Sequence, residues 1–375
     1  MENFILNKKY YYSWWKNIDK TIFSIIILLF VVGLFFSLVS TSLVASNKLN
    51  TNDFSFFFKH TIFIFLGLLI IFFISSIDIK KLYKFSVFMF FLSIFFLILV
   101  PLIGVEVKGS KRWLDFILVP RFQPVELIKP FYIVMISMIL SNNFNLNINY
   151  KYFVSLFIAI FIAALLMIQP DIGQTLLILS SWAILIFTSG VNIYIFSIFI
   201  LLSFSSLLYL VMFVPKFAYI QKRIFSFFNS ETGTHNFQSD KAIESISSGG
   251  FFGKGLGEGT LKNRVPEAHT DYIVSVISEE YGVISIILII ILFLIYIYCV
   301  FKKISFEEDD KIKLILTGCI SLILIQALVH IGVNIRLFPT TGMTLPYLSY
   351  GGSSIISISF LSGIILNLTK RRVNK

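Results

Sequence analysis

The chain consists largely of apolar runs of about 20 residues, and this repetition restricts its fold more than any other feature. Hydrophobic residues fill 57% of the 375 positions and charged residues only 14%, and the mean hydropathy is +0.87. A helix of about 20 apolar residues crosses the hydrocarbon core of a bilayer. The sequence therefore predicts an all-α, polytopic membrane protein without a large soluble domain.

Ten of these runs are predicted to span the membrane. An even number of spans places both termini on one side, where short loops such as 80–84 and 302–313 are rich in Lys. Because basic residues concentrate in cytoplasmic loops, we expect cytoplasmic N and C termini. The first run is too long for a cleaved signal peptide and is counted as a span. The predicted spans are about residues 21–45, 56–76, 82–103, 123–141, 151–169, 171–189, 192–214, 271–300, 312–337 and 347–369.

The formal net charge of +11 raises the question of a nucleic-acid partner. The basic residues lie in short loops between apolar runs, which favours anionic lipid headgroups, so we predict no nucleic-acid binding. Many cations of the opposite side fall in 104–122 and 215–270, where they either bind an anion or only solvate an exposed loop. Cys299 and Cys319 lie in or beside apolar runs, which argues against disulfides and a metal site.

Three ionisable residues, Glu267, His269 and Asp271, cluster at the start of the eighth predicted span. Charge in hydrocarbon costs about 2.5–3.5 kcal/mol per group at a helix centre, so such a cluster usually lines a cavity or takes part in chemistry. Helix capping is the simpler interpretation, but one capping residue would be enough. Helical spacing also predicts one polar face for Asp271, Ser275 and Glu279. We expect Asp271 to present a carboxylate that is accessible from outside.

The fourth predicted span contains Glu126 and Lys129, which are three residues apart and can pair on one helical face. An ion pair inside a membrane helix is either a structural contact or part of a site, and the sequence leaves both open. Just upstream, Lys111 and Arg112 precede Trp113. Trp is common at membrane interfaces, whereas cations grouped with it could hold a phosphate.

Three further motifs each have a structural and a functional interpretation. Asp171 follows a Gln-Pro pair and is interpreted first as a helix N-cap. Gln326, His330 and Asn334 repeat every four residues, which predicts a polar stripe in which the His is hydrogen-bonded rather than catalytic. The Gly-rich run around Lys254 lacks the residues of a Walker A motif, although its backbone could still approach a substrate.

Together, these motifs resemble the SEDS family of bacterial shape and division proteins, over nearly the whole chain. Each motif is weak alone, whereas their order and spacing are specific. One departure is Val125, where the family has Ser, and it removes a hydroxyl beside Glu126. The motifs are Gly109 to Trp113, Gln123 to Glu126, Gln169 to Asp171, Pro215-Lys216, Arg223-Ile224, Gln238, Ser248 to Gly257, Pro266 to Asp271, Glu279-Glu280 and Pro346 to Ser353.

The resemblance implies a ten-span glycosyltransferase that polymerises lipid II, the lipid-linked peptidoglycan precursor, on the outer face of the cytoplasmic membrane. Such proteins act with a class B penicillin-binding protein, which is the transpeptidase, and with other division proteins. The residues from Glu267 to His269 and from Thr340 to Pro346 favour the division (FtsW-like) branch, and hence the septum, over the elongation (RodA-like) branch. The implied layout is a single domain over 1–375, with a cytoplasmic N-terminus at 1–20, a large periplasmic loop at 215–270 and a cytoplasmic tail at 370–375.

For this reaction we expect Asp271 to be the general base that takes the proton of the acceptor sugar hydroxyl. The growing glycan would be the donor, and its undecaprenyl diphosphate would leave with inversion. A divalent cation, Mg²⁺ or Mn²⁺, could share in neutralising the diphosphate, but no residue cluster indicates one. The substrate-binding candidates are Lys111, Arg112, Trp113, Glu126, Lys129, Arg223, Lys254, Glu267 and His269.

Three other functions are compatible with parts of the pattern. A lipid II flippase would use the same polar stripes, but it needs a polar path to the cytoplasmic leaflet, and most charged motifs gather at the outer end. A RodA-like elongation polymerase would differ in cellular role rather than in chemistry. A scaffold that only recruits the penicillin-binding protein would leave the cluster from Glu267 to Asp271 unexplained.

Overall fold

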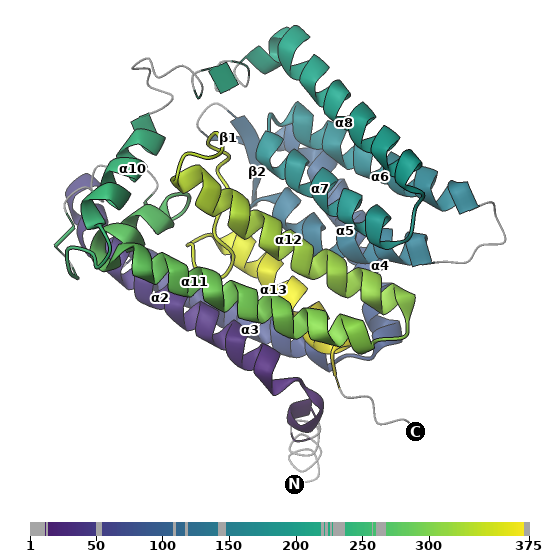
Figure 1. Cartoon of the computed structure of the whole chain (residues 1–375), viewed down its shortest axis with the longest axis horizontal. Coiled ribbons are helices and arrows are strands. Elements are labelled where there is room, and N and C mark those ends of the chain that lie inside the picture. Colours follow the sequence, from purple (N-terminus) through teal and green to yellow (C-terminus); the bar gives the residue numbers. More distant parts are fainter. Residues whose placement is uncertain are drawn as a thin grey trace.

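Ten apolar helices dominate the structure, a computed structural model of the chain (Figure 1). Among the described residues, eight of these helices are long enough to cross a membrane, and α7 and α13 are shorter, with 17 residues each. Each helix matches one predicted span, which confirms an all-α polytopic membrane protein. The described residues are 12, 14–49, 55–107, 110–116, 119–141, 148–218, 221, 224–225, 227, 237–256, 258–259 and 268–370. The helices are α2 (Lys20–Leu49), α3 (Ser55–Ser76), α4 (Ile79–Ile103), α5 (Pro124–Ser141), α6 (Ile148–Ile168), α7 (Ile172–Thr188), α8 (Ile193–Phe213), α11 (Ile273–Phe306), α12 (Asp310–Asn334) and α13 (Gly352–Leu368).

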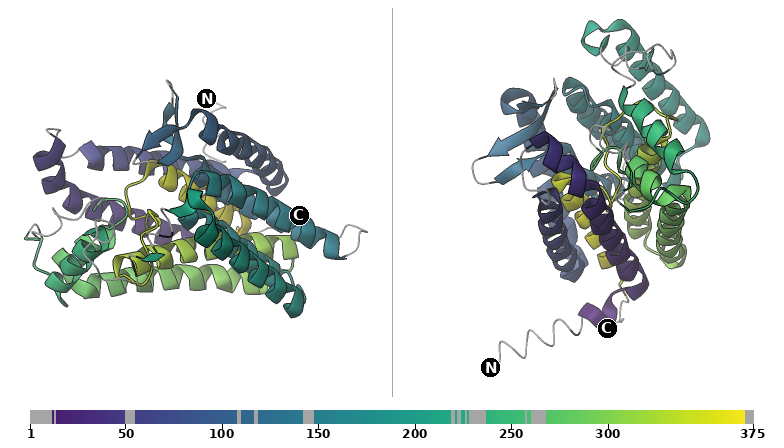
Figure 2. Two further views of the ribbon diagram at one scale, coloured as in Figure 1. Left: turned by 90° about the horizontal axis from the view of Figure 1, so that it is seen from above. Right: turned by 90° about the vertical axis from the view of Figure 1, so that its left-hand side faces the viewer.

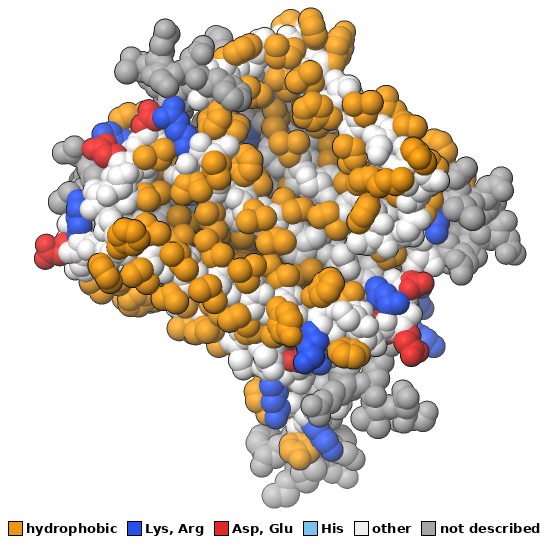
Figure 3. All heavy atoms as spheres, viewed as in Figure 1, with side chains coloured by type: hydrophobic (Ala, Val, Ile, Leu, Met, Phe, Trp, Pro, Cys, Tyr) orange, Lys and Arg blue, Asp and Glu red, His pale blue; other side chains and the backbone are white. Residues whose placement is uncertain are grey.

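The core of the bundle lies around α5 and α13, which are buried along most of their lengths. Helix α13 packs against α3, and α5 packs against α4 and α12. Helix α8 lies at the edge of the bundle, and Val211 is its one buried residue (Figure 1). Many large apolar side chains are exposed, and they are widespread on the face shown in Figure 3, which agrees with a lipid environment.

The start of α2 and the end of α13 lie at the same end of the bundle (Figure 1). There, Lys303 Nζ of α11 donates to an Asp19 carboxylate oxygen at 2.7 Å. Asn367 Nδ2 of α13 donates to the carbonyl oxygens of Ile74 and Ile77, at 2.6 and 2.8 Å. This arrangement agrees with an even number of spans, and the assignment of this end to the cytoplasm stays a prediction.

A three-stranded antiparallel sheet lies at the opposite end, in the loop 104–122 for which no strands were predicted. Its strands β1 (Val105–Val107), β2 (Ser110–Phe116) and β3 (Val119–Phe122) are paired in the order β1-β2-β3. Phe96 of α4 holds the sheet through ring contacts with Phe116 and Phe122, at centroid distances of 6.3 and 5.5 Å. Both views of Figure 2 show the sheet projecting from the side of the bundle.

Helix α11 is broken at Gly282, whose φ of 74° is left-handed. The break leaves backbone groups of α11 without hydrogen-bond partners inside the helix. The turn formed by residues 250–256, which follows α10 (Phe237–Gly249), supplies these partners. Two N–H groups of the turn donate to carbonyls before the break, and two carbonyls of the turn accept from N–H groups after it. The bonds join Lys254 N to Glu279 O at 2.9 Å, Gly255 N to Glu280 O at 3.0 Å, Val283 N to Gly250 O at 3.0 Å and Ile284 N to Phe251 O at 3.4 Å.

We expect Gly282→Ala to lower the melting temperature of the purified protein more than Gly250→Ala does. Both glycines have a left-handed φ, which costs a residue with a Cβ about 1–3 kcal/mol. A Cβ at Gly282 would also lie 2.0 Å from the Phe251 carbonyl oxygen, whereas nothing lies within 4 Å of one at Gly250. Thermal unfolding in detergent measures the difference, and equal melting temperatures for the two variants would contradict the tight contact.

Candidate functional site

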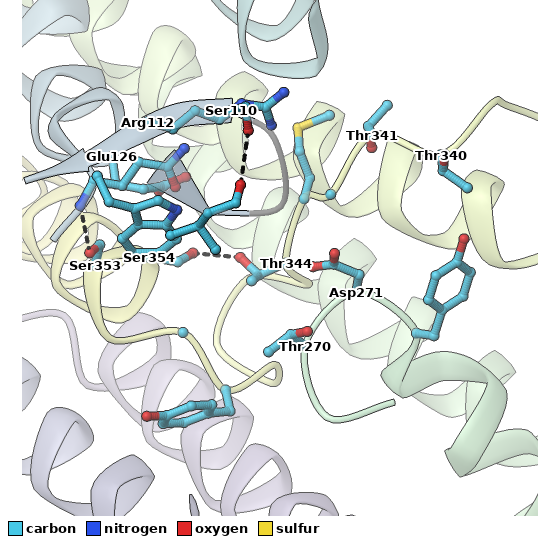
Figure 4. Close-up of a pocket in the computed structure, with 18 of the residues that line it drawn as sticks. Ser110, Arg112, Glu126, Thr270, Asp271, Thr340, Thr341, Thr344, Ser353 and Ser354 are labelled. Carbon is cyan, nitrogen blue, oxygen red and sulfur yellow. Dashed lines mark hydrogen bonds between the residues drawn. The ribbon is translucent and has the colours of Figure 1, made fainter. Parts of the chain in front are cut away.

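A cavity of about 580 Å³ opens at the end of the bundle that carries the sheet (Figure 4). It is formed by segments that are far apart in the sequence, because the sheet, the start of α5, the start of α11 and the loop before α13 converge there. Polar and apolar side chains both line it. The lining residues are Val107, Ser110, Arg112, Trp113, Arg121, Gln123, Glu126, Gln238, Thr270 to Tyr272, Val333, Thr340 to Thr344, Tyr350, Gly351, Ser353 and Ser354.

Asp271 lines this cavity, which agrees with the predicted accessible carboxylate. That the cavity opens to the outside of the membrane stays a prediction. Its side chain is half-buried and points into the cavity beside Thr344 (Figure 4). Helix α11 begins only at Ile273, with Tyr272 as its N-cap. The prediction that Asp271 shares a helical face with Ser275 is therefore wrong, because Asp271 precedes the first turn.

Gly342 leaves space beside one oxygen of Asp271. A Cβ built on Gly342 would lie 3.7 Å from Asp271 Oδ2, and the left-handed φ of 72° also disfavours any larger residue there. Gly342 belongs to the loop that leads from α12 to α13, and this loop lines one wall of the cavity. On its side, Gly342 therefore has no side chain that covers the Asp271 carboxylate.

The predicted polar stripe of α12 holds this loop and the backbone of Asp271. Gln326 Nε2 donates to the Thr344 carbonyl at 3.0 Å, and His330 Nδ1 lies 2.7 Å from the Met343 carbonyl. Asn334 Nδ2 donates to the Asp271 carbonyl at 3.1 Å. The stripe is thus hydrogen-bonded, including its His, as predicted.

Asn334 also caps the start of α11 from the neighbouring helix. Its side chain is fully buried, and its Oδ1 accepts the Ser275 N–H at 3.2 Å. This N–H also bonds to the Tyr272 carbonyl at 3.1 Å. Because Tyr272 provides no side-chain cap, the side chain of Asn334 in α12 takes that role for the first turn. One amide group therefore fixes both the Asp271 carbonyl and the beginning of the helix that follows.

Glu126 and Lys129 form the predicted ion pair at the floor of the cavity. Lys129 Nζ lies 2.7 Å from Glu126 Oε1 and donates to Gln326 Oε1 at 3.1 Å. Gln174 Nε2 donates to the same Glu126 oxygen at 2.9 Å. Glu126 lines the cavity, whereas Lys129 is fully buried beneath it. The pair thus joins α5, α7 and α12 while presenting one carboxylate to the cavity.

Arg112 joins the sheet to the turn between α6 and α7. Its guanidinium donates to the carbonyls of Gln169 and Pro170, and its Nη1 lies 3.6 Å from a carboxylate oxygen of Asp171. Asp171 is the N-cap of α7, as predicted, and accepts the Gln174 N–H at 3.3 Å. Arg112 also lines the cavity, so this cation is held in place before any ligand arrives.

The structure places the other candidates in different surroundings. Trp113 lines the cavity beside Arg112, whereas Lys111 is exposed on β2 and lies opposite Glu106 of β1 in the strand register. His269 packs against the rings of Phe56 and Tyr350, with centroids 4.6 and 6.1 Å away.

Lys254 lies outside the cavity lining, and its Nζ is 3.7 Å from an oxygen of the buried Glu279 carboxylate. Arg223 and Glu267 lie outside the described residues. The structure therefore brings Asp271, Arg112, Trp113 and Glu126 together, and their roles toward a substrate stay predictions.

Hydroxyl side chains also line the cavity, and none of them was predicted to bind substrate. Thr344 and Ser354 are hydrogen-bonded to each other at 2.7 Å, and the Gln123 N–H donates to Ser353 Oγ at 3.0 Å (Figure 4). The available signal was the uncharged polar stretch from 340 to 354 between two apolar runs. Within the described part of the chain, no group of three or more His, Cys, Asp or Glu residues is placed to hold a metal ion.

The fold and the site define a polytopic membrane protein with a polar, carboxylate-bearing cavity at one end of its helix bundle. Residues 19–374 match the model of the FtsW, RodA and SpoVE family, described as cell cycle proteins. The chain belongs to this family, which confirms the resemblance seen in the sequence.

Curated relatives match almost the full chain. The probable peptidoglycan glycosyltransferase FtsW of Caulobacter vibrioides is 32% identical over 96% of this chain and 91% of the relative. The protein of the same name from Trichlorobacter lovleyi is 35% identical over 92% and 93%. Stage V sporulation protein E of Bacillus subtilis is 32% identical over 93% and 97%.

Solved structures share the fold. A chain of a peptidoglycan synthase complex, studied for its coordination of polymerization and crosslinking, has a TM-score of 0.75 at 22% identity over 94% of this chain and 97% of that chain. The rod shape determining protein RodA of Thermus thermophilus has a TM-score of 0.67 at 23% identity over 94% and 96%.

Proposed function

We propose that the chain is a peptidoglycan glycosyltransferase that polymerises lipid II into glycan strands at the outer face of the cytoplasmic membrane during septal wall synthesis. The observation that carries the proposal is the half-buried carboxylate of Asp271 in a cavity rich in hydroxyl groups, within a chain whose relatives bear this name. Such a cavity offers hydrogen bonds to a sugar and a base for one of its hydroxyls.

In the proposed reaction, the 4-hydroxyl oxygen of the acceptor GlcNAc attacks the anomeric carbon at the reducing end of the growing glycan. The bond between that carbon and the diphosphate oxygen breaks, and undecaprenyl diphosphate leaves with the electron pair. The hydroxyl proton passes to the Asp271 carboxylate, and attack from the face opposite the leaving group inverts the anomeric centre. Positioning the two sugars in one cavity contributes as well, because it removes the entropic cost of their encounter.

The leaving diphosphate needs positive charge nearby. Of the predicted cations in the described part of the chain, Arg112 is the one that lines the cavity, and its contacts with the α6–α7 turn hold it in place. Lys129 lies beneath the cavity and balances the negative charge of Glu126. Lys111 and Lys254, which lie outside the cavity lining, remain candidates for contact with the lipid-linked diphosphate. Arg223 remains a candidate as well, and it lies outside the described residues.

The placement of the cavity favours polymerisation over flipping of lipid II. A flippase needs a polar path to the opposite leaflet, whereas beyond Lys129 the buried residues of α5 carry no charge and are mostly apolar, such as Phe131, Ile133 and Ile136. The partner we propose is a class B penicillin-binding protein, in keeping with the similar fold of a chain from a peptidoglycan synthase complex. The division septum of the cytoplasmic membrane is the proposed location, since most of the curated relatives compared are named FtsW.

The test is polymerisation of purified lipid II by the full-length protein in vesicles, with and without a class B penicillin-binding protein of the same cell. We expect glycan strands that resolve as a ladder on gel electrophoresis. Exchange of fluorescent lipid II between leaflets without strand formation would support the flippase and contradict the proposal.

We expect Asn334→Ala to lower the turnover number for polymerisation by roughly 10- to 100-fold with a smaller change in KM. Loss of this amide releases the Asp271 carbonyl and the first turn of α11, and small displacements of a catalytic group carry losses of this size. The matched control is Asn367→Ala, because Asn367 is equally buried and donates to two carbonyls at the other end of the bundle. A similar loss of turnover in both variants would contradict a positioning role.

A further inference from the structure

We propose that the turn formed by residues 250–256 enters the membrane surface at the cavity end and anchors α10 to the lipid. Three large apolar side chains protrude from this turn. Phe251, Phe252 and Leu256 are 74%, 83% and 66% exposed, respectively. Isolated exposed apolar residues are common, but three on one short turn form a patch that calls for a covering surface.

The position of the turn along α11 points to lipid as that surface. The N–H groups of Val283 and Ile284 bond to the turn, so the turn lies at the level of the break in α11. About 20 helical residues cross the hydrocarbon core, and counting back by that number from the exposed Lys302 reaches Gly282. The turn therefore lies at the hydrocarbon boundary opposite the Lys302 end.

The exposed face of α11 is apolar from the turn toward Lys302. Below the turn, Ile284, Ile287, Leu288 and Ile291 are 38%, 48%, 60% and 44% exposed. Figure 3 shows apolar side chains along α11 up to the end at which α10 packs. The turn thus extends the lipid-facing surface of a spanning helix and does not form a separate patch in water.

Several backbone groups of the turn are paired within the protein, which lowers the cost of their contact with hydrocarbon. The N–H groups of Gly253, Lys254 and Gly255 donate to carbonyls of the protein, and the Gly250 and Phe251 carbonyls accept from α11. Glycines also allow this close approach, because a Cβ at Gly253 would lie 2.1 Å from the Glu280 carbonyl oxygen.

Fluorescence depth measurements test the proposal. The variant is Phe252→Cys in a chain that also carries Cys299→Ala and Cys319→Ala, labelled with an environment-sensitive fluorophore and reconstituted into phosphatidylcholine–phosphatidylglycerol vesicles. We expect a blue shift of the emission and quenching by a nitroxide attached near the head of the acyl chain, with little quenching by iodide in water. An exposed side chain such as Phe252 tolerates the substitution, and an unchanged melting temperature verifies this.

Two matched positions calibrate the result. Glu258→Cys labels an exposed residue next to the turn, where we expect quenching by iodide. Leu288→Cys labels the lipid-facing side of α11, where a nitroxide near the middle of the acyl chain should quench most. If the Phe252 probe behaves like the Glu258 probe, the proposal is wrong. The proposal is equally wrong if the Phe252 probe is protected from iodide only when a penicillin-binding protein is added, because the patch is then a protein-docking surface.

Discussion

Replacing Asp271 by Asn is expected to abolish glycan polymerisation from lipid II while the protein remains folded in the membrane. Asn has nearly the same shape as Asp but cannot accept a proton from the acceptor hydroxyl, and loss of a general base typically lowers the rate about 10²- to 10⁴-fold. The Asp271 carbonyl would keep its bond from Asn334, since that bond involves the backbone. Strand formation by the purified variant, compared with the unmodified protein at equal concentration, measures the loss.

The matched control is Asp309→Asn, which alters a carboxylate at the other end of the bundle. Asp309 is the N-cap of α12, where its side chain accepts the Lys311 N–H at 2.9 Å. An amide oxygen can still accept this bond, so we expect nearly full polymerisation. Glycan strands of normal yield from Asp271→Asn would remove this residue from the mechanism, whatever the control shows.

Replacing Lys129 by Met is expected to destabilise the protein by about 3–5 kcal/mol, because it leaves the Glu126 carboxylate buried without its counter-charge. Lys129 is fully buried and contacts both Glu126 and Gln326, so the loss affects the packing of α5 against α12. The melting temperature in detergent and the yield of folded protein report the effect.

A double replacement distinguishes the effect of the ion pair on stability from the effect of the Glu126 carboxylate on activity. With Glu126→Gln and Lys129→Met together, no charge is left uncompensated, and replacing both members of a buried pair is often neutral for stability. We expect the double variant to recover most of the melting temperature but not the polymerisation rate, because the carboxylate at the cavity floor is gone. A double variant as unstable as Lys129→Met would show that the pair is not what stabilises this region.

The membrane helices could be predicted because hydrophobic length alone determines them. Each predicted span has one helix in the structure, and the pair of Glu126 and Lys129 followed from their spacing within one helix. The sheet was not predictable in the same way. Its strands are short, and in β2 Arg112 and Trp113 interrupt the alternation of polar and apolar residues that identifies a strand.

The cavity depends on contacts that no local pattern contains. The Gln123 N–H bonds to Ser353, which lies 230 positions later, and Asn334 binds the backbone of Asp271 across 63 positions. Local spacing even misplaced Asp271 on a helix, because the N-terminal end of α11 is set by Asn334 and not by a nearby cap. The residue types of the site could be recognised from the sequence, whereas their arrangement results from helix packing.

The absence of a side chain at position 342 has a consequence for catalysis. An acceptor hydroxyl that gives its proton to Asp271 must come within about 2.6–3.2 Å of a carboxylate oxygen. A methyl group at position 342 would lie 3.7 Å from Asp271 Oδ2, in van der Waals contact, and would cover part of this oxygen. In the proposed reaction, glycine at this position thereby leaves the carboxylate oxygen open to the acceptor hydroxyl.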